Sequence, residues 1–140
     1  ESEMNYIEIS PIADRIGQQL RNHLVHEVNP LGKTGANKYI LKITLSENKE
    51  NLAIKKSAVA TRTNLHFEAS YEIRLKSNGA LMTNGKSHIT TSFNILNQSF
   101  STIVAEKNAR SRAVREISSD LGVKIASFFR LNKTLDKKKQ

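Results

Sequence analysis

The chain has 140 residues, of which 38% are hydrophobic and 25% are charged, and its formal net charge is +9. These values are typical of one folded domain with a buried core, and they exclude disorder over most of the length. No apolar run approaches the roughly 20 residues that a membrane-spanning helix needs, and the absence of cysteine excludes disulfides and thiol nucleophiles.

The positive charge is unevenly distributed. The first fifty residues are nearly neutral, whereas residues 51–140 carry the basic excess. Such a field attracts phosphate groups on nucleic acid, on a membrane surface or on a lipid. The alternative is that the charge only keeps the protein soluble. Composition alone favours neither interpretation over the other.

A short strand and an amphipathic helix are predicted at the start of the chain. Residues 4–9 favour a strand, after which Ser10 is expected to cap a helix and Pro11 to occupy its first position. Apolar residues then recur every four positions, which predicts one buried helix face ending near residue 28. These residues are Ile12, Ile16, Leu20, Leu24 and Val28.

The middle of the chain favours strands. Residues 29–37 are rich in Asn, Pro and Gly and predict a loop; residues 39–45 then alternate as in a strand, and Ser46 to Asn51 predict a polar turn. Residues 65–76 alternate between apolar and polar without a break, with the apolar residues at odd positions. Between residues 54 and 60 the apolar members are at even positions, so a bulge, a kink or a turn is expected around Thr61–Asn64.

A hairpin is predicted at Asn78-Gly79. The return strand has its apolar members at odd positions, as the preceding strand does. A three-residue loop, Ser77 to Gly79 with Gly79 in the left-handed conformation, keeps odd positions opposite odd ones.

A second long helix is predicted over residues 101–129. Its apolar stripe consists of Ile103, Val114, Ile117, Leu121, Ile125 and Phe128, and small Ala109 and Ala113 permit close approach to the sheet. The order β-α-β-β-β-α predicts an α+β fold with a mixed, mainly antiparallel sheet and two long helices packed on one face. We expect one domain over residues 1–132 and a basic, disordered tail over residues 133–140. The expected core contains Ile16, Leu20, Leu24, Phe67, Tyr71, Ile73, Phe93, Val114, Ile117 and Leu121.

The sequence does not favour an enzyme. Histidines 23 and 26 lack a metal-binding companion motif, and Glu68 and Glu72 are separated by about 13 Å along a strand, too far apart for a catalytic carboxylate pair. We therefore expect no catalytic residue, no metal site and no cofactor.

Basic side chains on the sheet are the better candidates for a binding site. Arg74, Lys76 and Lys86 are expected on the wet face near the hairpin, and Arg62 at the phase change, where they could hold phosphates. The alternative is a solvated face partly neutralised by the neighbouring glutamates. Basic residues on the second helix favour a solvent-facing stripe; they are Lys107, Arg110, Arg112 and Arg115.

Several short motifs resemble those of the LptE family of alphaproteobacteria, the outer-membrane lipoproteins of lipopolysaccharide assembly. The predicted first helix contains the motif Pro-Ile-Ala-Asp-Arg-x-Gly-Gln-Gln-Leu-Arg-Asn, from residue 11 to residue 22. Further landmarks in the same order are Ala60-Thr61-Arg62, Ala69 to Ile73, Asn78-Gly79, Gly85, Ser92-Phe93-Asn94, Ala105-Glu106, Ala109, Arg112 and Ala113. The family usually has Tyr in place of Phe93.

The resemblance implies a non-catalytic outer-membrane lipoprotein on the periplasmic face. Such a protein would plug the LptD β-barrel, help it to assemble and bind lipopolysaccharide during transport to the outer leaflet. An N-terminal lipid anchor upstream of Glu1 would hold it to the outer membrane, and no nucleic acid would be bound.

Two alternatives are kept. A basic α-β-β-β-α order is also that of double-stranded-RNA-binding domains, which read A-form RNA by its shape with a basic helix start such as residues 105–113. Strands of ten or more residues and the missing Lys-Lys pair count against this hypothesis. The other alternative is a periplasmic domain that binds a different anionic ligand.

Overall fold

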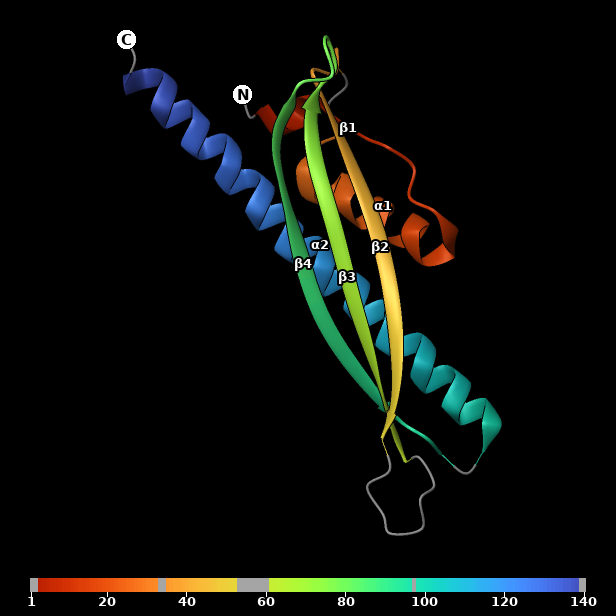
Figure 1. Cartoon of the computed structure of the whole chain (residues 1–140). Coiled ribbons are helices and arrows are strands. Elements are labelled where there is room, and N and C mark those ends of the chain that lie inside the picture. Colours follow the sequence, from red (N-terminus) through yellow and green to blue (C-terminus); the bar gives the residue numbers. More distant parts are fainter. Residues whose placement is uncertain (1–2, 33–34, 53–60, 97, 139–140) are drawn as a thin grey trace.

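The computed structural model describes residues 3–32, 35–52, 61–96 and 98–138, with side chains as far as residue 133. The first described element is a short 3-10 helix, η1 (Glu3–Tyr6). The strands and helices that follow it are, in chain order, β1 (Ile7–Ile9), α1 (Asp14–Val28), β2 (Tyr39–Leu52), β3 (Arg62–Leu75), β4 (Leu81–Asn94) and α2 (Ser99–Lys138). This order and the α+β class confirm the prediction from sequence (Figure 1).

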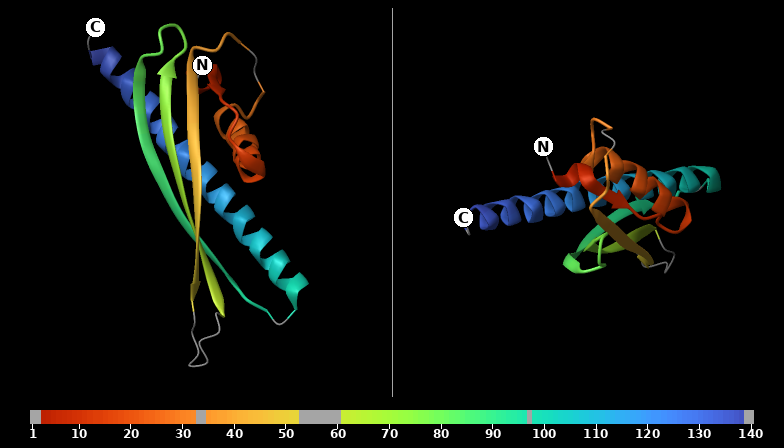
Figure 2. Two further views of the ribbon diagram at one scale, coloured as in Figure 1. Left: turned by 45° about the vertical axis from the view of Figure 1, so that its right-hand side comes forward. Right: turned by 90° about the horizontal axis from the view of Figure 1, so that it is seen from above.

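The sheet has the strand order β1-β2-β3-β4, with β1 parallel to β2 and the other neighbours antiparallel. β2, β3 and β4 have 14 residues each, so the sheet is about 45 Å long. Both helices lie on the same face, and α2 crosses the sheet obliquely (Figure 2). No helix of the described residues covers the opposite face.

The first helix begins later than predicted. Ser10 does not cap it, because the Ser10 N–H donates to the Leu41 carbonyl at 3.0 Å and continues the pairing of β1 with β2. The chain turns only at Asp14, whose φ of 69° is left-handed, a conformation that aspartate tolerates better than most residues. The helix ends at Val28 as predicted.

The predicted turn at Ser46–Asn51 is wrong, since β2 continues to Leu52 and pairs with β3 throughout. Beyond Leu45 the helix-facing positions are charged instead of apolar. Glu47 lies 2.7 Å from Arg110, and Lys49 lies 2.5 Å from Glu106. At this end the sheet therefore contacts α2 through ion pairs, which makes the strand look like a polar turn in the sequence.

The bulge, kink or turn expected around Thr61–Asn64 is not found in the described part of that range. From Arg62 to Asn64 the strand β3 pairs regularly with both neighbours. The even-numbered apolar residues that suggested a phase change belong to residues 53–60, which are outside the described residues.

The hairpin loop also differs from the prediction. The Leu75 N–H donates to the Ala80 carbonyl at 2.9 Å, so the loop comprises residues 76–79, with Gly79 left-handed as expected (φ 74°). This longer loop places Arg74 opposite Leu81, but an irregularity after Ile73 restores the pairing of odd with odd positions. Odd positions of β3 therefore lie opposite odd positions of β4, as predicted, and the bulge after Ile73 makes this pairing possible.

The core lies between the sheet and the helices. All residues predicted for it are buried except Ile16, which is half-buried. Tyr71 packs across Gly85, where any Cβ would lie 2.6 Å from the Tyr71 hydroxyl oxygen. This glycine is therefore explained by the aromatic ring that occupies its side-chain space.

Helix α2 is longer than predicted. It extends from Ser99 to Lys138, and Ala109 and Ala113 are fully buried at the predicted close approach. Ile103, expected in the buried stripe, is instead 61% exposed because it precedes the part of the helix that packs on the sheet. The division into a domain over residues 1–132 and a tail over 133–140 remains a prediction.

A polar contact fastens α2 to β4. The buried Ser87 hydroxyl donates to the Asp120 carboxylate at 2.6 Å, and Lys124 lies 2.9 Å from the same oxygen. The Lys124 ammonium also donates to the Lys86 carbonyl at 2.7 Å. These contacts satisfy polar groups at the edge strand that the helix would otherwise leave unpaired.

This contact predicts a pH dependence of stability. The hydrogen bond from Ser87, followed by the interaction with Lys124, lowers the pKa of Asp120 below its ordinary value of 3.8. The ionised carboxylate therefore stabilises the fold at neutral pH, and this contribution is lost as the pH falls through the folded pKa. We expect Asp120→Asn to lower the urea midpoint at pH 7, with the difference from wild type shrinking below about pH 4. Glu116→Gln, at an exposed site on the same helix, is the control; a constant difference for Asp120→Asn would contradict the prediction.

Candidate functional site

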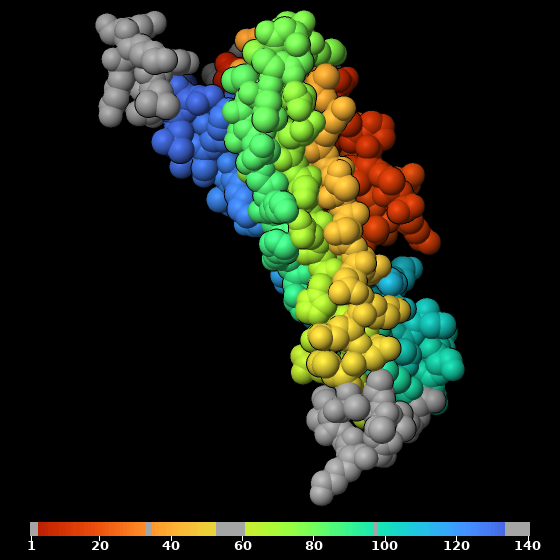
Figure 3. All heavy atoms as spheres, viewed as in Figure 1, coloured from red at the N-terminus to blue at the C-terminus, as the bar shows by residue number. Residues whose placement is uncertain are grey.

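The four basic residues predicted to bind an anion do not form one cluster. Arg62 is the first residue of β3. Arg74 and Lys76 lie at the other end of this strand, at the hairpin, about 40 Å away along the strand. Lys86 lies between them on β4. The helix-free face of the sheet, which faces the viewer in Figure 3, thus holds separate basic positions.

Three of these four side chains have a carboxylate partner. The N–O separations are 3.0 Å for Arg74 and Glu72, 3.8 Å for Lys76 and Glu8, and 3.2 Å for Lys86 and Glu68. The hydrogen bond from Arg74 lowers the pKa of Glu72, and that from Lys86 lowers the pKa of Glu68. The acids are ionised at neutral pH, so the field of these cations is partly cancelled.

Arg62 has a different environment, because its partner is neutral. Its Nη2 donates to the Ser92 hydroxyl at 2.7 Å, and Nη2 of Arg112 on α2 donates to the Ser92 carbonyl at 3.0 Å. Neither arginine has an ion pair with a carboxylate of the described residues. One serine on the edge strand therefore holds two uncompensated guanidinium groups, one from the sheet and one from the helix.

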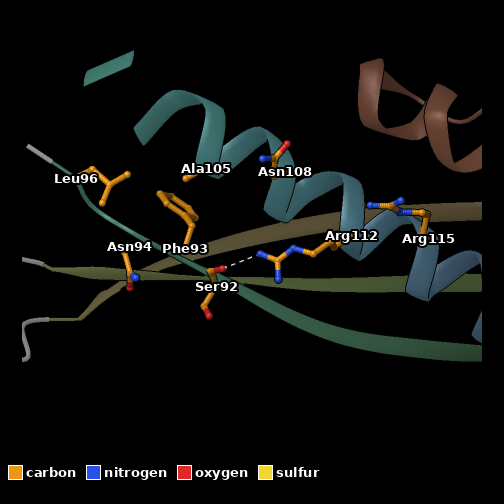
Figure 4. A pocket seen from close by; sticks show the side chains of 8 residues that line it. All are labelled: Ser92, Phe93, Asn94, Leu96, Ala105, Asn108, Arg112 and Arg115. Carbon is orange, nitrogen blue, oxygen red and sulfur yellow. Dashed lines mark hydrogen bonds between the residues drawn. The ribbon is translucent and has the colours of Figure 1, made fainter. Parts of the chain in front are cut away.

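An open hollow of about 540 Å³, lined in part by Arg112 and Ser92, lies between the end of β4 and the first half of α2 (Figure 4). Its lining combines an apolar part with amide and guanidinium groups. The lining residues are Ser92, Phe93, Asn94, Leu96, Ala105, Asn108, Arg112 and Arg115.

Large apolar side chains are exposed on the connection into α2 and on its first turns, and one of them, Leu96, lines the hollow. Phe100 is 75% and Ile103 is 61% exposed. Leu96, Ile95 and Val104 are also exposed on the connection into α2 and on its first turns. Apolar surface beside uncompensated arginines suits an amphiphile that has both an anionic group and hydrocarbon.

The sequence predicted part of this site. Arg62 is among the predicted residues, but the sequence predicts Arg112 in a solvent-facing stripe, because its approach to Ser92 depends on how α2 crosses the sheet. A signal was present at the start of α2, where Phe100 and Ile103 are apolar outside the packed part of the helix. Arg110 of the same stripe is bound by Glu47 and Glu106 instead.

Among the described residues, no group of three or more His, Asp or Glu side chains could hold a metal ion. Glu68 and Glu72, the two acids on the strand, are bound to Lys86 and Arg74 and not to each other.

The fold is shared with solved structures of bacterial lipoproteins. A candidate lipoprotein from Caulobacter crescentus matches with a TM-score of 0.71 at 21% identity, over 91% of this chain and 93% of that one. Rare lipoprotein B from Shewanella oneidensis matches with a TM-score of 0.65 at 10% identity, over 91% and 98%. A lipoprotein B from Nitrosomonas europaea matches with a TM-score of 0.62 at 15% identity, over 88% and 81%.

These likenesses establish a lipoprotein B-like fold that spans nearly the whole chain. No protein-family model matches the sequence, and a search of the curated proteins finds no significant match. Within the described residues, neither helix has an apolar stretch that could cross a bilayer.

Proposed function

We propose that this protein is a non-catalytic outer-membrane lipoprotein of the LptE type that binds lipopolysaccharide and serves the LptD β-barrel as plug and assembly partner. One observation carries the proposal. In a lipoprotein-like fold, two arginines without carboxylate partners among the described residues meet at Ser92, beside a hollow whose lining includes Phe93 and Leu96.

Lipopolysaccharide has the chemistry that this site suits, since it presents phosphates and acyl chains on one molecule. Arg62 and Arg112 each bond Ser92 through Nη2, and a guanidinium carries further N–H donors that can bind a phosphate. Phe93, Leu96 and Ala105 supply apolar surface for part of an acyl chain. In this proposal the arginines at Ser92 are the primary lipid site.

Arg74, Lys76 and Lys86 remain a second candidate patch for the lipid. Their charges must first be released from Glu72, Glu8 and Glu68, so we expect a smaller contribution from them. In this proposal, a lipid anchor on the N-terminal side of Glu1 holds the protein on the periplasmic face of the outer membrane.

The test is a comparison of two ligands. We expect the protein to bind labelled lipopolysaccharide more tightly than labelled duplex RNA, with affinity that decreases as salt rises, because exposed charges are screened over about 8–10 Å near physiological ionic strength. Fluorescence anisotropy at low and high salt measures both. Tighter RNA binding, together with lipopolysaccharide binding that does not respond to salt, would replace this function with the RNA-binding alternative.

A further inference from the structure

The last part of α2 leaves the body of the protein. Among the side chains of α2 that the structure describes, Phe129 is the last that is buried, and Arg130, Leu131 and Lys133 after it are exposed. The 40-residue helix is about 60 Å long and crosses a sheet of about 45 Å at an angle. Its C-terminal end therefore projects beyond the sheet, as Figure 1 shows.

This projecting end lies beside the start of the chain. The Tyr39 hydroxyl donates to Glu3 at 3.1 Å, and the Tyr39 ring makes an edge contact with Phe129, with ring centroids 5.0 Å apart. Glu3 and Phe129 are thus joined through one side chain. A lipid anchor attached upstream of Glu1 would place the membrane at the end of the molecule from which α2 projects.

The charge at this end suits an anionic surface. Between residues 130 and 139 the sequence has five basic residues and one acid, Asp136; the basic ones are Arg130, Lys133, Lys137, Lys138 and Lys139. Lys38 and Lys76 lie at the same end, near Glu3 and Glu8. Exposed Leu131 adds an apolar side chain to the projecting helix.

We propose that α2 after Phe129 lies on an anionic phospholipid surface and acts as a second, electrostatic attachment beside the lipid anchor. Each Lys or Arg close to an anionic surface adds appreciably to membrane binding, so a basic helix end can act together with a lipid anchor. The second attachment would also fix the direction in which the Ser92 site points. The proposal rests on the proposed anchor for its location, but the helix can be tested without it.

The experiment is vesicle sedimentation of the 140-residue chain with phosphatidylcholine alone and with added phosphatidylglycerol, without lipopolysaccharide. We expect binding only to vesicles with phosphatidylglycerol, weakened at least tenfold by Lys133→Glu, Lys137→Glu and Lys138→Glu together. The matched control reverses three basic residues far from this end, Arg15→Glu, Lys49→Glu and Lys107→Glu, and should lose much less binding. Circular dichroism checks that both triple variants are folded.

The outcomes separate this proposal from the lipopolysaccharide proposal, since no lipopolysaccharide is present. Absence of wild-type binding to phosphatidylglycerol vesicles would overturn it, as would equal losses in the two triple variants. Equal binding to uncharged vesicles would show that apolar contacts, not charge, attach the protein. The variant with Lys133→Glu, Lys137→Glu and Lys138→Glu can also be tested with lipopolysaccharide. If it is folded and loses phosphatidylglycerol binding but keeps lipopolysaccharide binding, the end of α2 and the arginines at Ser92 are distinct sites.

Discussion

Leu20→Ala is expected to lower the free energy of unfolding by about 2–5 kcal/mol, the range for removing a large side chain from a packed core. Leu20 is fully buried on the face of α1 that packs on α2 and the sheet. Urea denaturation at neutral pH measures the loss. Val25→Ala on the exposed side of the same helix is the control and should cost less than about 1 kcal/mol. A loss for Leu20→Ala as small as that of the control would show that the helix face is misassigned.

Reversing the two arginines at Ser92 is expected to have the largest effect on binding. Arg62→Glu with Arg112→Glu should weaken lipopolysaccharide binding at least roughly a hundredfold, because hydrogen bonds to charged groups contribute about 1.5–3 kcal/mol each. The fold should survive, since neither residue belongs to the core. Lipopolysaccharide titration, with circular dichroism as a check of folding, measures the effect.

Two further variants sharpen this comparison. Arg15→Glu with Lys42→Glu makes the same change in net charge at exposed sites away from the hollow and should reduce affinity only a few-fold. Reversal of Arg74, Lys76 and Lys86 should weaken binding several-fold, because their charges are already shared with glutamates. If that triple variant loses more affinity than the double variant at Ser92, the primary lipid site is at the hairpin end.

Periodicity in the sequence predicted the parts of the fold in which side chains alternate between core and solvent. The alternation from Leu65 onward defines the buried face of β3, and the four-residue spacing to Leu24 and Val28 defines the packed face of α1. In both elements the pattern results from burial of one side, which local sequence records directly.

The predictions from sequence are wrong or incomplete where a contact with a distant part of the chain decides the structure. Glu47 and Lys49 continue β2 because α2 supplies opposite charges, and no local pattern shows those partners. Ser10 would be a good helix cap, but its backbone is used by β2. The Ser92 site was only half predicted for the same reason, since Arg112 reaches β4 only through the crossing of α2 over the sheet.

Co-purification with the LptD barrel tests the central claim most directly. The tagged protein is expressed together with its cognate barrel, and the complex is isolated in detergent and analysed for both proteins and for bound lipopolysaccharide. We expect a stable one-to-one complex, and less folded barrel when this protein is omitted. A barrel that folds equally well alone, with this protein eluting separately and free of lipopolysaccharide, would contradict the proposed function.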